Sequence, residues 1–366
     1  MTESSRLKRE AFGQKMTDIL NCSAINLAMA IGYRTGLFEV MASFSIPQTV
    51  EAISLQAGLN ERYVREWLGI MFTGKIIELS EGEDKKDYYL LPPEHASMLT
   101  RSAGNTNLAV YTQEIPLLTK CAMEEVIHSF QNGAGVPYSC YPLFQAFMSE
   151  LANAKHRQVL LEKFLPSVEN GNLIARLKKG IRVCDIGCGE GVATLLMAEA
   201  FPKSFFIGID IDDKALSVAK NAAAKPGLKN IDFYMLDAAD IRSNKEWTER
   251  FDYITAFDSI HDQRAPLDAL VSIYAILAPN GLFSMVDIAA HTSHCDNCDH
   301  PMGPFLYTVS LMHCMPVGLF DGGVGLGMMW GREQAAKMLQ KAGFINVKVE
   351  EIPEDPFNLH FCCRKE

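Results

Sequence analysis

Long hydrophobic runs and an excess of positive charge are what this sequence lacks. No apolar run in its 366 residues approaches the roughly 18 residues that argue for a membrane span. Lys and Arg total 34 against 44 Asp and Glu, which gives a formal net charge of −10. Phosphate backbones and anionic membranes repel such a chain. We therefore expect neither a nucleic acid nor a membrane as a partner.

The opening residues, MTESSRLKREAFGQK, also lack the apolar core of a secretion signal. Hydrophobic residues make up 48% and charged residues 21%, which excludes a disordered or low-complexity chain. Of the ten cysteines, Cys362 and Cys363 are adjacent in a strand-like run, where alternation directs them to opposite faces. Cys184 lies in an apolar run, as a small core residue does. We expect reduced cysteines and a cytoplasmic protein.

The pattern of the chain changes once, near residue 170, and no internal repeat is present. Before this point the pattern is mostly helical, and after it strands and helices alternate. Such alternation is typical of a mainly parallel sheet with helices on both faces. The sequence therefore predicts an α/β fold with a mostly helical domain, 1–170, before a sheet domain, 171–366.

The first domain contains the pattern of a winged helix-turn-helix. Two helices broken by Gly58 precede a small hairpin. Such units often bind DNA, but the segment 78–87 carries five acids against Lys85 and Lys86, the opposite of what a DNA-reading wing needs. We expect packing or dimerisation instead. The helices are predicted at 49–57 and 60–73, and the strands at 75–79 and 88–91.

A glycine-rich turn follows the first strand of the second domain. The apolar strand 182–186 leads directly into Gly187-Cys188-Gly189-Glu190-Gly191 and then a helical pattern at 192–200. Glycines at a strand-to-helix turn let the backbone approach a ligand and direct helix N-terminal amides at it. A nicotinamide dinucleotide site needs a third glycine where Val192 stands, which weakens the interpretation as a dehydrogenase.

Acidic residues stand at or near the carboxyl ends of four successive strands. In doubly wound sheets this edge is where ligands bind. Each acid alone fits a helix N-cap, but four in series beside the glycine turn favour a binding site. A carboxylate 21 residues after Gly189 is placed to accept both hydroxyls of a ribose. The four are Asp185, Asp210, Asp237 and Asp258.

The segments VCDIGCGEG, GIDI, LDAAD and FDSIHD together resemble the successive motifs of class I S-adenosylmethionine-dependent methyltransferases. The resemblance implies a Rossmann-like, seven-stranded sheet whose last strand is antiparallel, and the short connection PEDPF before the final strand agrees with it. Further segments, among them GLNERYVREWL, GVPY and GLGMMWG, resemble a subfamily that places a winged helix before the methyltransferase domain. In plan it is similar to the plant caffeate-type and animal hydroxyindole O-methyltransferases, which implies a homodimer whose N-terminal domain, 1–170, dimerises and helps to cover the substrate.

The resemblance also implies roles at the glycine turn. Gly187, Cys188 and Gly189 would pass against the methionine portion of S-adenosylmethionine. Asp185 would fix the turn and approach the amino group, while Asp258 would lie near the sulfonium. We expect the Cys188 thiol to be incidental.

Four more residues would hold the nucleoside portion of the cofactor. The resemblance implies that Asp210 binds the ribose hydroxyls and that Ile211 lies beside the adenine. Asp237 would accept a hydrogen bond from the adenine amino group, next to the backbone amide of Ala238.

His261 is the candidate catalytic residue. It lies in IHDQ, which resembles the L-H-D-W segment whose histidine is the general base of plant-type O-methyltransferases, although Gln263 stands in place of tryptophan. A neutral imidazole suits proton removal. The residues alone fit a structural histidine in an exposed loop; the resemblance favours the base. Catalysis by orientation alone is the alternative.

A C-x-x-C flanked by histidines, at 291–300, could bind zinc. Only one such pair is present, where structural zinc sites usually supply two. We therefore expect Cys295 and Cys298 to be loop residues without a metal, and we predict no metal in the protein.

Methyl-acceptor residues are expected from two segments. The loop 133–138 contains two glycines and a proline, which marks either a shaped loop or a plain connection. The run 301–330 is rich in Met, Phe and Tyr, and ordinary core packing explains most of it. We select Tyr138, His313 and Trp330 as substrate residues.

The sequence thus predicts a methyltransferase that acts on an oxygen, nitrogen or sulfur of a small molecule. Methylation of DNA or amides is disfavoured because 258–261 reads DSIH instead of a proline-rich tetrapeptide. One alternative is a winged-helix transcription regulator that senses S-adenosylmethionine, against which the acidic wing argues. The other is a nicotinamide oxidoreductase, against which Val192 argues.

Overall fold

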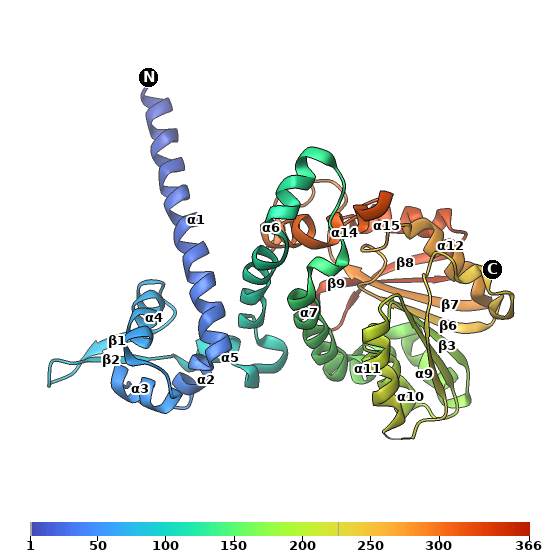
Figure 1. The fold of residues 1–366 in the computed structure, drawn as a ribbon, viewed down its shortest axis with the longest axis horizontal. Helices are drawn as coiled ribbons and strands as arrows, with labels where there is room; N and C mark the ends of the chain where they lie inside the picture. Colours follow the sequence, from blue (N-terminus) through green and yellow to red (C-terminus); the bar gives the residue numbers. More distant parts are fainter. Residues whose placement is uncertain (1, 226) are drawn as a thin grey trace. The chain divides into compact units, whose positions relative to one another are not determined.

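The computed structural model describes residues 2–225 and 227–366 (Figure 1). The chain divides into two compact units, one ending at Leu117 and one from Leu118 to Glu366. The change of pattern near residue 170 therefore lies inside the second unit, just before its sheet begins. The assignment of dimerisation and substrate covering to 1–170 stays a prediction.

The first unit has the winged-helix order that the sequence predicts. Asn60 caps α4 by accepting a hydrogen bond from the Arg62 amide at 3.0 Å. The indole Nε1 of Trp67, on α4, donates to the Ala28 carbonyl at 2.9 Å and joins α4 to α1. The elements are α1 (Glu3–Thr35), α2 (Leu37–Ala42), α3 (Val50–Ala57), α4 (Glu61–Thr73), β1 (Glu78–Glu81), β2 (Asp87–Leu90) and α5 (Pro93–Leu99). Short 3₁₀ turns, Arg101–Thr106 and Ala109–Gln113, then lead to α6 (Glu114–Asn132).

The second unit is built around a seven-stranded sheet in the order β5-β4-β3-β6-β7-β9-β8. Five strands are parallel, and β9 runs antiparallel to both β7 and β8. This confirms the predicted Rossmann-like sheet with an antiparallel last strand. The strands are β3 (Arg182–Ile186), β4 (Phe205–Asp210), β5 (Ile231–Met235), β6 (Phe251–Phe257), β7 (Leu277–Ile288), β8 (Ile345–Ile352) and β9 (Asp355–Arg364).

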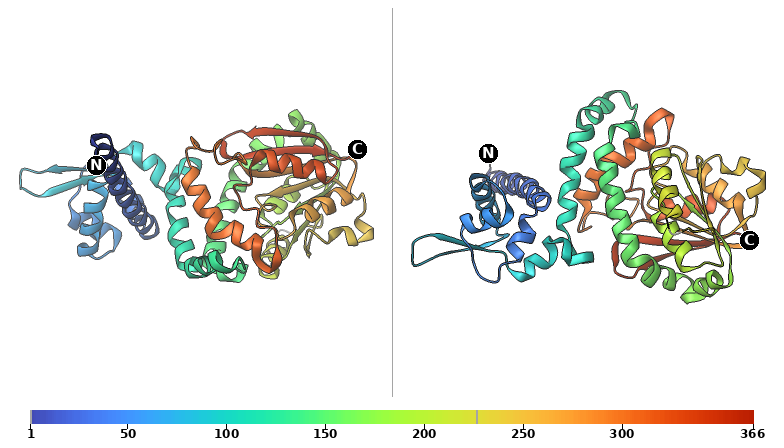
Figure 2. Two further views of the ribbon diagram at one scale, coloured as in Figure 1. Left: turned by 90° about the horizontal axis from the view of Figure 1, so that it is seen from above. Right: turned by 60° about the horizontal axis from the view of Figure 1, so that its bottom comes forward.

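Helices cover both faces of the sheet, as the views in Figures 1 and 2 show. One core cluster packs α9, α10 and α11 on one face, and another packs α12 and α15 on the other. Cys362 belongs to the first cluster and Cys363 to the second, so these neighbours face opposite sides as predicted. The helices are α9 (Asn172–Lys179), α10 (Val192–Ala200), α11 (Asp213–Ala224), α12 (Pro266–Ile276) and α15 (Gly331–Lys341).

Two further helical segments lie side by side (Figures 1 and 2). The Tyr141 hydroxyl, just before α7, donates to the Met312 carbonyl at 2.7 Å and ties them together. The first consists of α7 (Pro142–Lys155), a π-helical stretch (His156–Phe164) and α8 (Leu165–Ser167). The second consists of α13 (Gly303–Val309), a π-helical turn (Ser310–Cys314) and α14 (Met315–Leu319).

This second segment corrects one expectation from the sequence. The helix Gly303–Gly322 has the length and the mean hydropathy, 1.2, of a candidate membrane span, although no apolar run of that length was expected. In the structure 44% of its most apolar window is buried inside the protein. Core helices of compact domains also meet this criterion, so it is weak evidence for a span.

Candidate functional site

The glycine turn lies where the strand order of the sheet reverses. From β3 the chain proceeds outward to β4 and β5, then returns to β6 on the other side of β3. Ligands of doubly wound sheets bind outside the carboxyl ends of the strands at such a point. We call this place, with the residues that follow β3, β4, β5 and β6, the switch-point edge.

The three glycines of the turn have left-handed backbones for different steric reasons. Their φ angles are +68° at Gly187, +53° at Gly189 and +72° at Gly191. A Cβ at Gly187 would lie 2.5 Å from the Ser259 Cβ, and one at Gly191 would lie 2.6 Å from the Phe233 ring. A Cβ at Gly189 would meet no atom within 4 Å. The turn is therefore tightly packed at both ends and open at Gly189.

Asp210, at the end of β4, is oriented by backbone amides. Its Oδ2 accepts from the Gly189 N–H at 2.8 Å, and its Oδ1 accepts from the Asp212 N–H at 2.9 Å. Burial raises the pKa of its carboxyl, and these amides act in the opposite direction. Ile211 next to it is 66% exposed. The structure thus brings Asp210 to the open glycine, as the sequence predicts for a ribose ligand.

Asp185 is buried beneath the turn. Its two carboxylate oxygens accept from the hydroxyls of Thr194 and Thr255, each at 2.7 Å. Burial raises the pKa of its carboxyl to about 6, against these two hydrogen bonds. Asp185 therefore holds β3, β6 and the start of α10 together, and its approach to an amino group stays a prediction.

Asp237 and Ala238 follow β5 at the same edge. Asp237 is exposed, and its Oδ1 accepts from the Ala239 N–H at 2.9 Å. Ala238 is buried in the core cluster that contains α12. An exposed carboxylate with a fixed rotamer fits the predicted contact to an adenine amino group.

Asp258 follows β6 directly and has a left-handed backbone, φ +48°. A left-handed backbone conformation is strained in a residue that has a Cβ, and residues with such strain occur often at functional sites. The side chain is exposed, yet the protein around its carboxyl raises the pKa to about 6. Asn358 donates to its Oδ2 at 3.3 Å. Beside it, the Ser259 hydroxyl donates to the Ile186 carbonyl at 2.8 Å, so this loop touches the glycine turn.

His261 is buried rather than part of an exposed loop, at 3% exposure. Its Nδ1 lies 2.8 Å from Oδ1 of Asp287, and its Nε2 lies 3.3 Å from Oδ1 of Asp262. Burial alone favours the neutral ring, but the carboxylates of Asp287 and Asp262 outweigh it and raise the pKa of His261 well above its usual value.

Asp287 and Asp262 were not selected from the sequence. Asp287 lies near the carboxyl end of β7, so the strand-end rule that selected the other acids could have found it. Asp262 follows His261 directly, and no pattern in the sequence distinguishes it.

Of the three predicted substrate residues, the structure brings two together. The ring centroids of Tyr138 and His313 are 5.9 Å apart. Tyr141, which the sequence reasoning missed, packs edge-on to His313 at 4.8 Å. Trp330 lies elsewhere, in the core cluster that contains α12 and α15. We name His261, Asp262, Asp287, His313 and Tyr141 the histidine cluster.

Tyr138 packs against the histidine cluster through His313 and lies within range of the charge of Asp210. The protein around its hydroxyl raises the pKa of Tyr138, and the charges of Asp262 and Asp210 add to this, although the residue is 42% exposed. The loop before it is shaped: a Cβ at Gly135 would lie 2.5 Å from the backbone of the 316–320 region. The Val136 amide donates to the Pro316 carbonyl at 2.9 Å. The loop is therefore more than a plain connection.

The 291–300 segment is a loop held by its own hydrogen bonds. Cys295 and Cys298 are exposed, and the two ring nitrogens of His300 contact the Ala289 carbonyl and the Met302 amide. His291 pairs with Glu333 at 2.7 Å. The expectation that this loop binds no metal stays a prediction.

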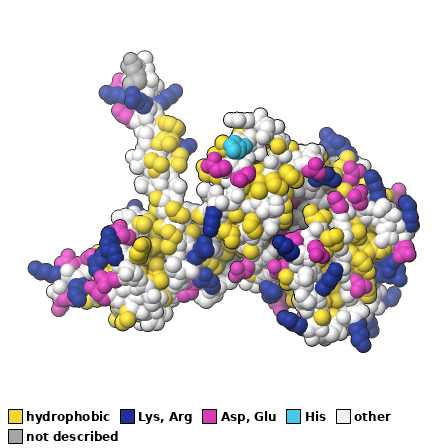
Figure 3. Space-filling model, in the orientation of Figure 1, with side chains coloured by type: hydrophobic (Ala, Val, Ile, Leu, Met, Phe, Trp, Pro, Cys, Tyr) yellow, Lys and Arg dark blue, Asp and Glu magenta, His cyan; other side chains and the backbone are white. Residues whose placement is uncertain are grey.

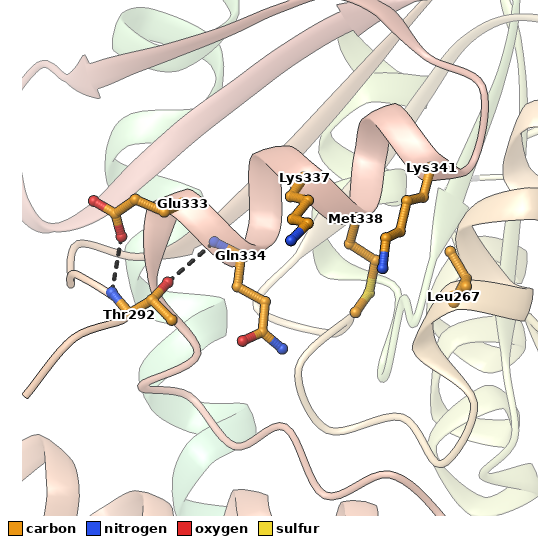
Figure 4. A pocket seen from close by; sticks show the side chains of 7 residues that line it. All are labelled: Leu267, Thr292, Glu333, Gln334, Lys337, Met338 and Lys341. Atoms are coloured by element: carbon orange, nitrogen blue, oxygen red, sulfur yellow. Dashed lines mark hydrogen bonds between the residues drawn. The ribbon is translucent and has the colours of Figure 1, made fainter.

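A hollow of about 350 Å³ lies along α15, and none of the predicted site residues lines it (Figure 4). Glu333 accepts from the Thr292 amide at 2.8 Å, and the Gln334 amide donates to the Thr292 hydroxyl at 3.0 Å. These bonds fix the start of α15. The other lining residues are Leu267, Lys337, Met338 and Lys341.

Comparisons with known proteins agree with this geometry. A family model described as a methyltransferase domain matches residues 177–311, and one described as an Rv2258c-like winged HTH domain matches 23–101. Ubiquinone biosynthesis O-methyltransferase of Haemophilus ducreyi is 32% identical over 111 residues, 30% of this chain and 46% of that protein. The matched region thus spans less than half of this relative.

Solved structures resemble the chain along its whole length. Human N-acetylserotonin methyltransferase, in complex with SAM, superposes with a TM-score of 0.66 at 15% identity, covering 100% of this chain and 98% of that one. The mitomycin 7-O-methyltransferase MmcR gives 0.65 at 17% identity, covering 98% and 99%. At such identities the likeness shows the fold alone.

Proposed function

We propose that this chain, which joins a winged helix domain to a methyltransferase domain, is an S-adenosylmethionine-dependent methyltransferase for small molecules. The acceptor atom is an oxygen, nitrogen or sulfur nucleophile. The observation that carries the proposal is the open Gly189, whose amide is held by Asp210 at the point where the strand order reverses.

The residues at the switch-point edge fit this cofactor. A side chain at position 189 would project into open space, so the backbone there is free to contact a ligand. Asp210 is fixed within reach of that space, and each of its oxygens keeps a further lone pair for a ribose hydroxyl. When bound, the cofactor supplies an electrophilic methyl group on a sulfonium sulfur.

The proposal assigns a part of S-adenosylmethionine to each predicted cofactor-binding residue. Gly187, Cys188 and Gly189 would hold the methionine portion, with Asp258 near the sulfonium. The nucleoside would be held by Asp210, Ile211, Asp237 and Ala238.

His261 is proposed as the general base. Its Nδ1 faces Asp287, and its Nε2, 3.3 Å from Oδ1 of Asp262, would accept the proton of the acceptor when the ring is neutral. Because the two carboxylates raise the pKa of His261, methyl transfer should rise with pH until the ring loses its proton. Asp287 fixes the ring, and together with Asp262 it stabilises the imidazolium that proton uptake creates. Tyr138 and His313 would line the acceptor site, where orientation of the nucleophile lowers the barrier further.

Calorimetry tests the cofactor assignment. We expect S-adenosylmethionine to bind and NAD not to bind, because Val192 replaces the third glycine of a nicotinamide site. Asp210→Ala should weaken S-adenosylmethionine binding by roughly tenfold or more, the value of hydrogen bonds to a charged group. The matched variant Asp232→Ala, on an exposed position of β5, should bind like the native protein. Tight NAD binding would refute the assignment.

The acceptor can then be found directly. Incubation of a metabolite extract with labelled S-adenosylmethionine and the protein should yield a product that gains the label. The His261→Ala protein is the control, and label transfer that it leaves unchanged would refute the role of His261.

The homodimer is part of the proposal, and α1 supports it. This helix of 33 residues exposes large hydrophobic side chains along its length (Figure 3). Such a surface on a water-soluble domain marks an interaction site. Sedimentation analysis should show two chains per particle, and Phe12→Glu with Leu20→Glu should yield one. The exposed residues are Leu7, Phe12, Met16, Ile19, Leu20, Leu27 and Ile31.

A cytoplasmic location is also proposed, because all ten cysteines are free in the structure. Cell fractionation with an antibody to the native chain would check it.

A further inference from the structure

Two members of the histidine cluster form a group of metal-ligand side chains with Cys314, the neighbour of His313 in sequence. His261, Asp262 and Cys314 each present one ligand atom, and these atoms lie within 4.8 Å of one another. His261 and Cys314 are buried, and Asp262 is partly buried. Within residues 2–225 and 227–366, this is the one group of three such side chains at this spacing.

The ring of His261 is already oriented for a metal ion. Its Nδ1 lies 2.8 Å from Oδ1 of Asp287, while Nε2 faces Oδ1 of Asp262 at 3.3 Å. Metal-binding histidines almost always donate their other N–H to a carboxylate or carbonyl, which fixes the tautomer. Asp287 supplies this carboxylate, and it is completely buried.

Polar atoms without a hydrogen bond surround the same place. Oδ2 of Asp287 and Nε2 of His313 are buried and lack a hydrogen bond within the described part of the chain, as does Oδ1 of Asp262, which makes an ionic contact with His261. Native proteins rarely leave such atoms unpaired, and an ion or water is a common explanation. His313 is 5% exposed, and its Nδ1 lies 3.6 Å from Sγ of Cys314.

Cys314 reaches this position through a π-helical turn, Ser310–Cys314. The turn is closed by the Met315 amide, which donates to the Ser310 carbonyl five residues earlier. Such turns occur often at functional sites. Here the turn directs the adjacent side chains of His313 and Cys314 inward together.

We propose, in place of the sequence-based prediction of no metal, that His261, Asp262 and Cys314 form a binding site for a divalent transition-metal ion, for which Zn²⁺ is the best match. Imidazole nitrogen, carboxylate oxygen and thiolate sulfur are the ligands of zinc, and three protein ligands leave one position open. Zinc bonds of about 2.0–2.3 Å place tetrahedral ligands roughly 3.3–3.8 Å apart, so the cluster needs only a small closure. Binding releases the thiol proton of Cys314 to solvent.

Occupation of the site would block the proposed general base, because the metal takes the lone pair of Nε2. This consequence rests on the proposed function, whereas the metal site does not. Binding can be measured without cofactor or acceptor, so failure of one proposal is distinguishable from failure of the other.

The test uses protein in which Cys295 and Cys298 are replaced by serine, which removes the exposed C-x-x-C. After chelator treatment, titration calorimetry with Zn²⁺ should give one ion per chain. Cys314→Ser and Asp262→Asn should each weaken binding by at least about tenfold. Cys22→Ser, at an exposed position in α1, is the matched control and should bind like its parent.

Cobalt(II) gives a second readout. Bound through Cys314, it should produce a thiolate-to-cobalt charge-transfer absorption that Cys314→Ser lacks and Cys22→Ser keeps. Because the Asp262 side chain is 25% exposed, Asp262→Asn decides the question even where Cys314→Ser fails to fold. Absence of binding to the parent protein, or binding unchanged by Asp262→Asn, would overturn the proposal.

Discussion

The switch-point edge and the histidine cluster belong to the same unit but are built by different kinds of contact. At the switch-point edge, backbone amides of neighbouring loops fix the side chains: the amides of Gly189 and Asp212 hold Asp210. In the histidine cluster, side chains from distant segments hold one another, as His261 and Asp287 do. The switch-point edge, fixed by backbone amides, can therefore bind the same cofactor throughout, while the histidine cluster, made of side chains, can exchange a methyl acceptor for a metal ion.

Replacement of His261 should give the largest effect and separates the two regions. We expect His261→Gln to lower methyl transfer about a hundred- to ten-thousandfold, since a positioned base contributes this much. Cofactor affinity should stay within about twofold, because the switch-point edge is fixed independently. Single-turnover kinetics and calorimetry measure the two quantities. Equal losses in both would show that the two regions are not independent.

The glycine turn provides a matched pair of substitutions. Gly187→Ala places a Cβ 2.5 Å from Ser259 in a left-handed backbone, and should cost about 2–5 kcal/mol of unfolding free energy. Gly189→Ala meets no atom, so only the backbone strain of about 1–2 kcal/mol remains. Its main effect should be weaker cofactor binding, because the methyl group enters the open space. Urea unfolding and calorimetry distinguish the two results, and equal loss of stability would contradict this account.

Acid should destabilise the sheet beside the histidine cluster through His360. Burial lowers the pKa of His360 to about 4, and its Nε2 lies 2.8 Å from the Ser284 hydroxyl. Its folded pKa is below the unfolded value of about 6.5, so its stabilisation is complete above pH 6.5 and is lost as the pH falls toward 4.

The loss of unfolding free energy that His360 causes between pH 6.5 and 4 is on the order of 3 kcal/mol. His360→Gln should flatten the fall of unfolding free energy between pH 6.5 and 4. His128→Gln, at an exposed position, should leave the slope as it is. An unchanged slope in His360→Gln would assign the acid sensitivity to other groups.

The smallest effect is expected in the wing of the first unit. The hairpin β1 and β2 carries exposed acids, so duplex DNA should not bind in a salt-sensitive manner at physiological ionic strength. Glu81→Gln should change neither cofactor affinity nor methyl transfer by more than about twofold. Fluorescence anisotropy with a labelled DNA duplex measures the binding of DNA. Salt-sensitive binding would support the alternative of a transcription regulator.

Much of the fold could be predicted because it depends on local patterns. The winged helix, the seven strands and the opposite faces of Cys362 and Cys363 follow from periodicity, caps and resemblance. The apolar character of 303–322 was underestimated because its polar residues are scattered rather than grouped.

Some residues of the candidate site could also be predicted from local patterns, and others could not. Asp210 beside Gly189 was predictable, since both lie at strand ends that the sheet must bring together. Tyr141 was not, because only the packing of α7 and 303–319 decides what faces His313. Asp262 was not selected either, because no pattern in the sequence distinguishes it. Trp330 was selected for its type, and the structure places it in the core.

The π-helical turn Ser310–Cys314 has a consequence for how the histidine cluster can change. A π-turn contains one residue more than an α-helical turn, and one residue rotates a helix by about 100°. Deletion of a single residue there would restore α-helical register and rotate every side chain that follows in α14. The length of this segment, more than the identity of any side chain in it, therefore decides which residues face His261.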